Sequence, residues 1–182
     1  VADLASDQNP SYAMRCLGSD ADGVADLLDD FVSGMREGGL SVTLKTFPGI
    51  GNVSADVTES IAENTDSLMT IRDTNFVPYA SGIQAGADCV MVSNAAYSKL
   101  TVKKVPAFMS QDIVTKLLRE ELGFDGIVMT SPLNDNVIEN NYTNEFAVVE
   151  AVKAGCDLIV LPGNFKECYE ALITAVEEGR ID

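Results

Sequence analysis

The strongest constraint on the fold of this chain is the alternation of short apolar runs with longer segments of helical periodicity. Each run is aliphatic or β-branched and is bounded by Gly, Pro, Asp or Asn, which is typical of buried strands. The runs are residues 1–5, 41–46, 88–93, 126–131 and 157–161. Strands that are apolar on both faces and are each followed by a helix indicate a parallel sheet covered by helices. The sequence therefore predicts an α/β fold.

The helical segments carry their own boundary signals. After the first run, apolar residues at helical spacing form one stripe, which ends before Gly38. The stripe consists of Val24, Leu27, Leu28, Phe31, Val32 and Met35. Ser110 is placed to cap a helix whose buried face lies within residues 113–118. Asn164, with a Glu three residues further on, predicts the start of the last helix.

Composition sets bounds on the class of protein. With 182 residues and 46% hydrophobic residues, the chain can bury a core as a single domain spanning residues 1–182, because domains of about 100 to 200 residues are usual. The net charge of −16 argues against nucleic acid as a partner, since binding to phosphates needs a basic patch. The chain has no histidine and no Cys-x-x-Cys pair, so neither a metal site nor a cofactor is predicted.

The sequence leaves the cellular compartment open. No apolar run approaches the ~20 residues of a membrane span, and the N-terminus does not have the pattern of a signal peptide. The chain begins with Val1 and not with methionine, so a targeting segment could have been removed.

A run near the middle of the first half suggests a family. Residues 45–52 read Lys-Thr-Phe-Pro-Gly-Ile-Gly-Asn. This run resembles the signature of glycoside hydrolase family 3, in particular its β-N-acetylhexosaminidase branch, where the same spacing reads Lys-His-Phe-Pro-Gly-His-Gly-Asp. Further segments of the family's N-terminal domain are matched by residues 86–94, 106–110, 118–126 and 154–162. The resemblance covers nearly the whole chain, in the family's order.

The resemblance implies a TIM-barrel-like parallel β/α domain that is incomplete in this chain. A closed barrel of eight strands needs about 250 residues, and this chain is similar to the family only from near its third strand onward. We therefore expect about five to six βα units, with the first two missing. Such a sheet has two exposed edges, which favours self-association or cover by another segment.

The residues at the family's catalytic positions do not support the family's chemistry. Retaining glycosidases use a nucleophile and an acid/base about 5 to 5.5 Å apart. Ser131 stands where the family has its nucleophilic Asp, and Thr58 replaces the acid/base His of an Asp-x-His triplet that begins at Asp56. A serine without a neighbouring base is a poor nucleophile. No catalytic residue is therefore predicted to be intact.

The resemblance also implies a remnant of a sugar-binding site. Arg15 is similar to the Arg of the family's Arg-x-Phe-Gly motif, Lys45 to the Lys of its signature, and Asn94 stands at one of its histidines. These residues are the predicted substrate contacts. The alternative is that Arg15 and Lys45 only form ion pairs with acidic loops.

Three functions remain open at this point. The first is binding of an amino sugar or cell-wall glycan without hydrolysis. The second is a non-enzymatic scaffold or protein-interaction module. The third is an active β-N-acetylhexosaminidase with relocated carboxylates, for which Asp56, Glu59 and Asp135 are the candidates.

Overall fold

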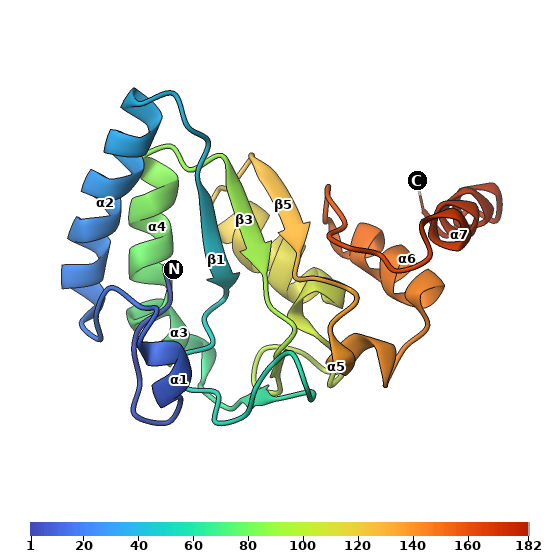
Figure 1. Cartoon of the computed structure of the whole chain (residues 1–182), viewed down its shortest axis with the longest axis horizontal. Coiled ribbons are helices and arrows are strands. Elements are labelled where there is room, and N and C mark those ends of the chain that lie inside the picture. The colour runs from blue at the N-terminus through green and yellow to red at the C-terminus, as the bar shows by residue number, and fades with distance from the viewer. Residues whose placement is uncertain (182) are drawn as a thin grey trace.

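The computed structural model describes residues 1–181 and contains a parallel sheet at its centre (Figure 1). The strands β1 (Thr43–Phe47), β3 (Cys89–Val92) and β5 (Ile127–Thr130) lie in the order β1-β3-β5. Leu44 pairs with Val90, and Val90 pairs with Val128. The α/β prediction is confirmed, and so are the strands predicted within residues 41–46, 88–93 and 126–131.

The predicted first strand was wrong. Residues 1–5 run beside β1, but only the amide of Ala2 donates to a backbone carbonyl there, that of Lys45 at 2.8 Å. The next position along the pair is occupied by a side chain, because the carboxylate of Asp3 accepts from the amide of Thr46 at 2.8 Å. A strand ladder cannot continue where a carboxylate replaces the backbone acceptor.

The predicted last strand is reduced to an isolated bridge between Leu158 and Met129. The hydroxyl of Thr130 accepts from the amide of Val160 at 3.1 Å, in place of a backbone carbonyl. Leu161 has a φ of 47°, which turns the chain out of the extended conformation. Within residues 1–181 the sheet therefore does not close into a barrel.

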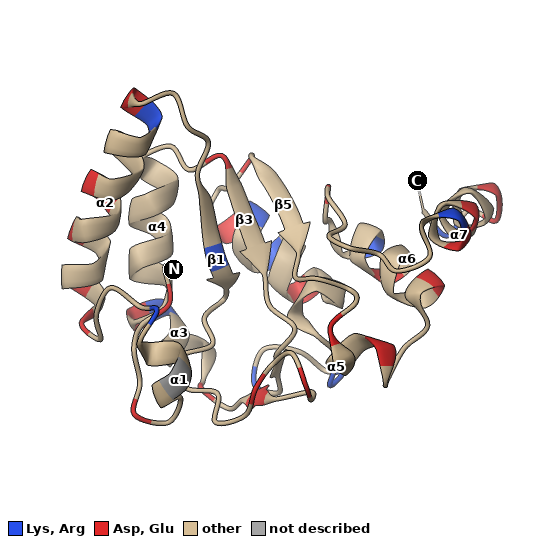
Figure 2. Cartoon of the chain, viewed as in Figure 1, with Lys and Arg blue, Asp and Glu red and all other residues tan. Residues whose placement is uncertain are grey.

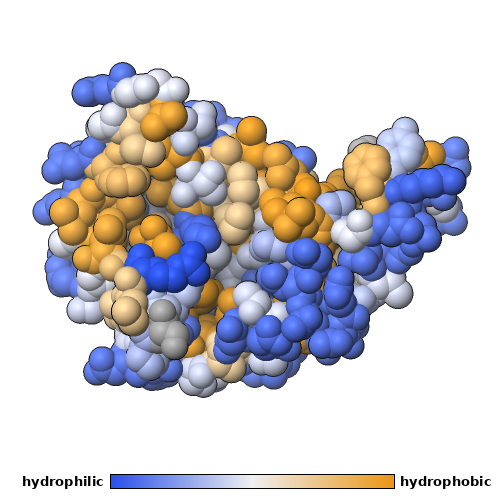
Figure 3. Space-filling view, in the orientation of Figure 1, coloured by the Kyte–Doolittle hydropathy of each residue, from blue (hydrophilic) through white to orange (hydrophobic). Residues whose placement is uncertain are grey.

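Two helices, α2 (Ala21–Glu37) and α4 (Phe76–Gln84), cover one face of the sheet beside its edge strand β1 (Figure 1). Helix α2 begins at Asp20, whose side chain accepts from the amide of Gly23, and it packs against α4. The predicted stripe on α2 is only half correct. Val24, Leu28 and Val32 are buried, whereas Leu27 and Phe31 remain 52% and 54% exposed because no described element covers that flank. Figure 3 shows apolar side chains gathered on this face, over the region of α2 and β1.

The remaining elements follow in chain order. They are α1 (Pro10–Ala13), β2 (Glu63–Asn64), α3 (Leu68–Asp73), β4 (Ala96–Tyr97), the 3₁₀ turn η1 (Ala107–Met109), the π-type helix η2 (Asp112–Glu121), α5 (Asn136–Glu139), α6 (Asn144–Ala154) and α7 (Phe165–Glu177). The strands β2 and β4 form a second, two-stranded parallel sheet, which joins the loops that follow β1 and β3.

Helix boundaries were predicted with mixed success. Helix η2 starts after Gln111, and Ser110 contributes its backbone carbonyl to the amides of Ile113 and Val114, so the predicted side-chain cap was wrong. The apolar residues of η2 are buried as expected. Asn164 does cap α7, by accepting from the amide of Glu167 at 3.5 Å.

Acidic and basic residues lie on different parts of the surface. Figure 2 shows acidic residues along the outer side of α2 and on α7, whereas a few basic residues lie near α1 and on β1. Within residues 1–181, no helix combines the length and the apolar character that a membrane crossing requires.

Candidate functional site

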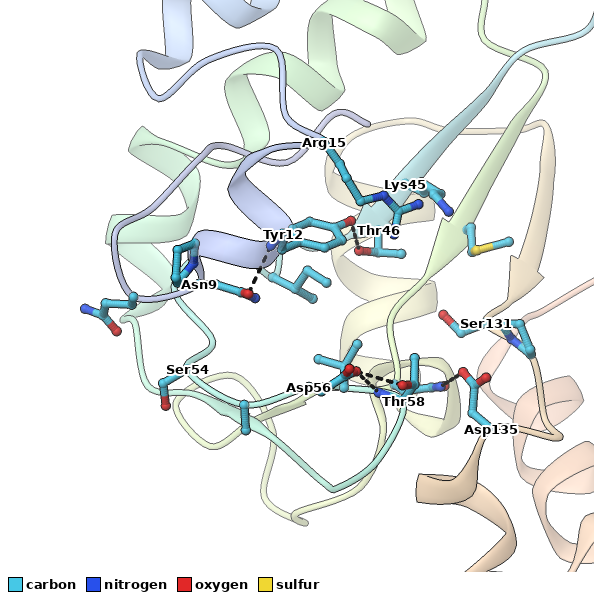
Figure 4. A pocket seen from close by; sticks show the side chains of 18 residues that line it. Asn9, Tyr12, Arg15, Lys45, Thr46, Ser54, Asp56, Thr58, Ser131 and Asp135 are labelled. Atoms are coloured by element: carbon cyan, nitrogen blue, oxygen red, sulfur yellow. Dashed lines mark hydrogen bonds between the residues drawn. The ribbon is translucent and has the colours of Figure 1, made fainter.

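A cavity of about 620 Å³ opens at the carboxyl ends of the sheet strands (Figure 4). Its lining comes from the segment around α1, from the end of β1 and the loop after it, and from the turns after β3 and β5. The site residues predicted at the family's positions line this cavity. They are Arg15, Lys45, Asp56, Thr58, Asn94 and Ser131. Of the other candidate carboxylates, Asp135 lines the cavity and Glu59 does not. The volume lies within the range of about 300 to 1,000 Å³ that is usual for small-molecule sites.

A buried carboxylate holds the first wall together. Asp3 is 1% exposed and accepts from the hydroxyl of Tyr12 at 2.7 Å, from the amide and hydroxyl of Thr46 at 2.8 Å each, and from the hydroxyl of Tyr79 at 3.3 Å. Burial raises the pKa of Asp3, and these hydrogen bonds oppose the shift. Asp3 therefore joins the α1 segment to the end of β1.

Two cations lie on this wall. The guanidinium of Arg15 lies over the ring of Tyr12, 5.5 Å from its centroid, so the position of Arg15 depends indirectly on Asp3. Lys45 is half-buried in the middle of β1, and its pKa is lowered by burial and further by Arg15. Across residues 1–181, the ion pairs that form involve other cations, such as Arg36 with Asp88. Among the ion pairs of the described residues, none therefore supports the alternative that Arg15 and Lys45 only brace acidic loops.

The opposite wall carries carboxylates. Asp56 accepts from the amide and hydroxyl of Thr58, at 2.8 and 2.7 Å, and these bonds lower the pKa of Asp56. The carbonyl of Thr58 accepts from the amide of Val137 in α5 at 2.8 Å, which joins the loop after β1 to the turn after β5. This contact brings Asp56 and Asp135 to the same side of the cavity (Figure 4).

Asp135 is held by an asparagine from the turn after β3, the strand next to β5 in the sheet. It accepts from Nδ2 of Asn94 at 2.8 Å. Burial raises the pKa of Asp135 against the effect of this bond, and the charges of Asp56 and Glu59 raise it further. Asn94 is 1% exposed, and its Oδ1 has no partner within the described part of the chain. An unsatisfied buried acceptor costs about 1 to 3 kcal/mol.

Ser131 is unsuited to act as a nucleophile. It is nearly buried, and its hydroxyl donates to the carbonyl of Val92 at 2.9 Å. The backbone carbonyl holds this proton but cannot remove it, and the chain has no histidine that could serve as a base.

The glycines of the signature run have a structural role. A Cβ at Gly51 would overlap the backbone carbonyl of Leu4, and Gly49 has a φ of 118°. The carbonyl of Gly49 accepts from the hydroxyl of Tyr97 at 2.9 Å. These contacts fix the backbone of the turn and leave no room for a side chain at Gly51.

Sequence reasoning missed Asp3 and Tyr12. A single Asp inside an otherwise apolar run, Val-Ala-Asp-Leu-Ala, was a signal for Asp3, because an isolated buried carboxylate needs partners. Tyr12 had no comparable signal, since its role depends on the fold. Among residues 1–181, no group of three or more His, Cys, Asp or Glu side chains could hold a metal ion.

A parallel α/β sheet whose strand ends open onto one polar cavity is the arrangement found in β/α-barrel domains, in which ligands bind at that edge of the sheet. Residues 1–182 match the Glycosyl hydrolase family 3 N terminal domain. The chain belongs to glycosyl hydrolase family 3, as the signature run predicted.

Two curated relatives illustrate the likeness. The chain is 31% identical over 153 residues to a beta-hexosaminidase of Xylella fastidiosa strain M23, covering 84% of this chain and 45% of that protein. It is 28% identical over 183 residues to a beta-N-acetylglucosaminidase/beta-glucosidase of Cellulomonas fimi, covering 96% and 32%. The chain thus spans less than half the length of these relatives.

Solved structures agree with the fold. A family 3 beta-N-acetylglucosaminidase from Paenibacillus sp. str. FPU-7 superposes with a TM-score of 0.94 at 32% identity, covering all of this chain and 35% of that one. A beta-N-acetylhexosaminidase from Beutenbergia cavernae gives a TM-score of 0.84 at 30% identity, covering 98% and 54%. The predicted incomplete TIM-barrel-like fold is confirmed.

Proposed function

We propose that this domain binds an amino sugar or a cell-wall glycan in the cavity and does not hydrolyse it by the family's covalent route. The observation that carries the proposal is that Arg15, Lys45 and Asn94 line one cavity. Similar proteins are named beta-hexosaminidase and beta-N-acetylglucosaminidase, which supports a sugar as the ligand.

The chemistry of the cavity supports binding over hydrolysis. At the predicted nucleophile position, the hydroxyl of Ser131 donates a hydrogen bond to a backbone carbonyl. At the acid/base position, Thr58 donates its hydroxyl to Asp56, and a threonine hydroxyl cannot supply a proton near neutral pH. Both groups are engaged with the protein, whereas the cations of the other wall are open to a ligand.

Sugar binding is expected to depend on both cations. In ligand-observed NMR with N-acetylglucosamine, its short oligomers and glucose as a specificity control, Arg15→Ala and Lys45→Ala are each expected to weaken binding about tenfold. Loss of a hydrogen bond to a charged group costs about 1.5 to 3 kcal/mol, and every 1.4 kcal/mol is tenfold. Lys103→Ala removes an exposed cation that does not line the cavity and should leave binding unchanged. Absence of binding at millimolar sugar would refute the proposal.

A second candidate function, an interaction module, is favoured by one surface. Helix α7 exposes apolar side chains along a single face, at spacings of four, four and three residues. They are Phe165, Tyr169, Ile173 and Val176, between 43% and 72% exposed. Monomers seldom expose such a stripe, so we propose that a second copy of the chain packs on it.

Self-association through α7 predicts a concentration-dependent dimer. Size-exclusion chromatography with light scattering should show the dimer in the wild type and a monomer in Tyr169→Glu, because a buried unpaired carboxylate opposes packing. Thr174→Glu places the same charge on the opposite face of α7 and should keep the dimer. A wild type that stays monomeric up to high micromolar concentration contradicts this candidate.

A further inference from the structure

The two walls of the cavity carry unmatched charges of opposite sign. Arg15 and Lys45 project from one side, and Asp56 and Asp135 lie on the other (Figure 4). In the described part of the chain, no ion pair joins one wall to the other. The cavity therefore has a cationic pole and an acidic pole.

Each pole is repulsive within itself. The pKa of Lys45 is lowered mainly by burial and also by the charge of Arg15. The pKa of Asp135 is raised mainly by burial and also by the charges of Asp56 and Glu59. The hydrogen bonds from Asn94 and Thr58 and the charge of Asp3 offset this repulsion only in part, and within residues 1–181 no ion pair with an opposite charge is formed at either pole. A counter-charge supplied by a ligand would relieve the repulsion. A neutral sugar would relieve neither pole, whereas a ligand with one charge of each sign would relieve both.

Asn94 points to a donor on the ligand at the acidic pole. Its Nδ2 is used by Asp135, and its buried Oδ1 has no partner among the described residues. Donors of the protein do not reach this oxygen, so an N–H of the ligand that binds beside Asp135 is suited to supply the missing bond. An ammonium group carries three such donors as well as the charge that Asp135 and Asp56 need.

We infer that the ligand is a dipolar amino sugar, with a free ammonium group at the Asn94–Asp135 end of the cavity and an anionic substituent, phosphate or carboxylate, at Arg15 and Lys45. This inference rests on the proposed sugar-binding function. It specifies an amino sugar whose amino group is not acetylated, because acetylation would remove the positive charge that the acidic pole attracts.

Isothermal titration calorimetry of the wild type at pH 7 and low salt tests the inference without any variant. Glucosamine 6-phosphate should bind at least about tenfold more tightly than N-acetylglucosamine 6-phosphate and than glucosamine, each of which lacks one of the two charges. 2-Amino-2-deoxyglucuronic acid carries the anion as a carboxylate, so its affinity decides between the two anionic groups. On binding glucosamine 6-phosphate, the pKa of Asp135, followed by carboxyl NMR, should fall.

Variants separate the two poles. Asp135→Asn should weaken glucosamine 6-phosphate by a larger factor than N-acetylglucosamine 6-phosphate, whereas Lys45→Ala should weaken both phosphates by a larger factor than it weakens glucosamine. Asp26→Asn, an exposed carboxylate on α2, is the control. If N-acetylglucosamine binds as tightly as glucosamine 6-phosphate, the inference is overturned and the proposed function stands. If no sugar binds, both are overturned.

Discussion

A chromogenic aryl β-N-acetylglucosaminide incubated with this protein is expected to release its aglycone no faster than in buffer alone. The covalent step needs an ionised carboxylate as nucleophile. The family resemblance predicts that Ser131 stands at this position, and its hydroxyl donates a hydrogen bond to the carbonyl of Val92. The leaving group needs a proton, and Thr58 cannot give one. Loss of a nucleophile or of its base lowers kcat roughly a millionfold in a serine protease, which indicates the scale of the expected loss here.

The contrary result would have a specific cause. The pKa of Asp56 is lowered by its bonds to Thr58, while burial raises the pKa of Asp135. Carboxylates whose environments move their pKa values apart are suited to act as base and acid. Turnover above background that disappears in Asp56→Asn or Asp135→Asn, but persists in Asp26→Asn, would show that the carboxylates of an active hexosaminidase have been relocated.

Replacement of Asp3 by alanine is expected to lower the free energy of unfolding by about 3 to 5 kcal/mol. The substitution removes the acceptor of four hydrogen bonds at once. The donors are the hydroxyls of Tyr12 and Tyr79 and both the amide and the hydroxyl of Thr46. Urea denaturation followed by circular dichroism measures the effect. Asp26→Ala, an exposed carboxylate on α2, should change stability by less than about 0.5 kcal/mol. Equal effects of the two substitutions would show that the Asp3 contacts contribute little.

The same carboxyl predicts a pH dependence with a defined sign. Burial raises the pKa of Asp3 above its ordinary value of 3.8, so the folded chain holds this proton more tightly than the unfolded chain does. The resulting stabilisation is complete below pH 3.8 and is lost as the pH rises through the folded pKa. The stability of the wild type relative to Asp3→Asn should therefore decrease as the pH rises above 3.8. An increase over that range would contradict the shift.

Local sequence patterns predicted the centre of the fold and failed at its two ends. The strands β1, β3 and β5 pair with strands on one or both sides, and most of their apolar residues are buried as the pattern requires, with Ile127 at the start of β5 an exception at 44% exposed. Residues 1–5 and 157–161 have the same pattern, but Asp3 and Thr130 use side chains where a ladder would need backbone groups. Whether a side chain takes the place of a backbone partner depends on its neighbours in space. Apolar composition alone does not report this.

The candidate site was predicted as a set of residues, and their roles remain predictions. The resemblance placed Arg15, Lys45 and Asn94 at ligand-contact positions, and the structure brings them to one cavity. It did not indicate that Asn94 binds Asp135. That contact joins the turns after β3 and β5, which are far apart in the sequence and adjacent only because their strands are parallel neighbours.

The sequence by itself determined the family, the three central strands and the absence of a histidine. These properties depend on residue identity and local periodicity, which are present in an unfolded chain. That Ser131 stands at the family's nucleophile position stays a prediction from the resemblance. Only the tertiary structure decided that Asp3 is buried among hydroxyls, that the hydroxyl of Ser131 is held by a carbonyl, and that cations face carboxylates across one cavity. Burial and the proximity of residues distant in sequence set hydrogen bonding and protonation, and both exist only once the chain has folded.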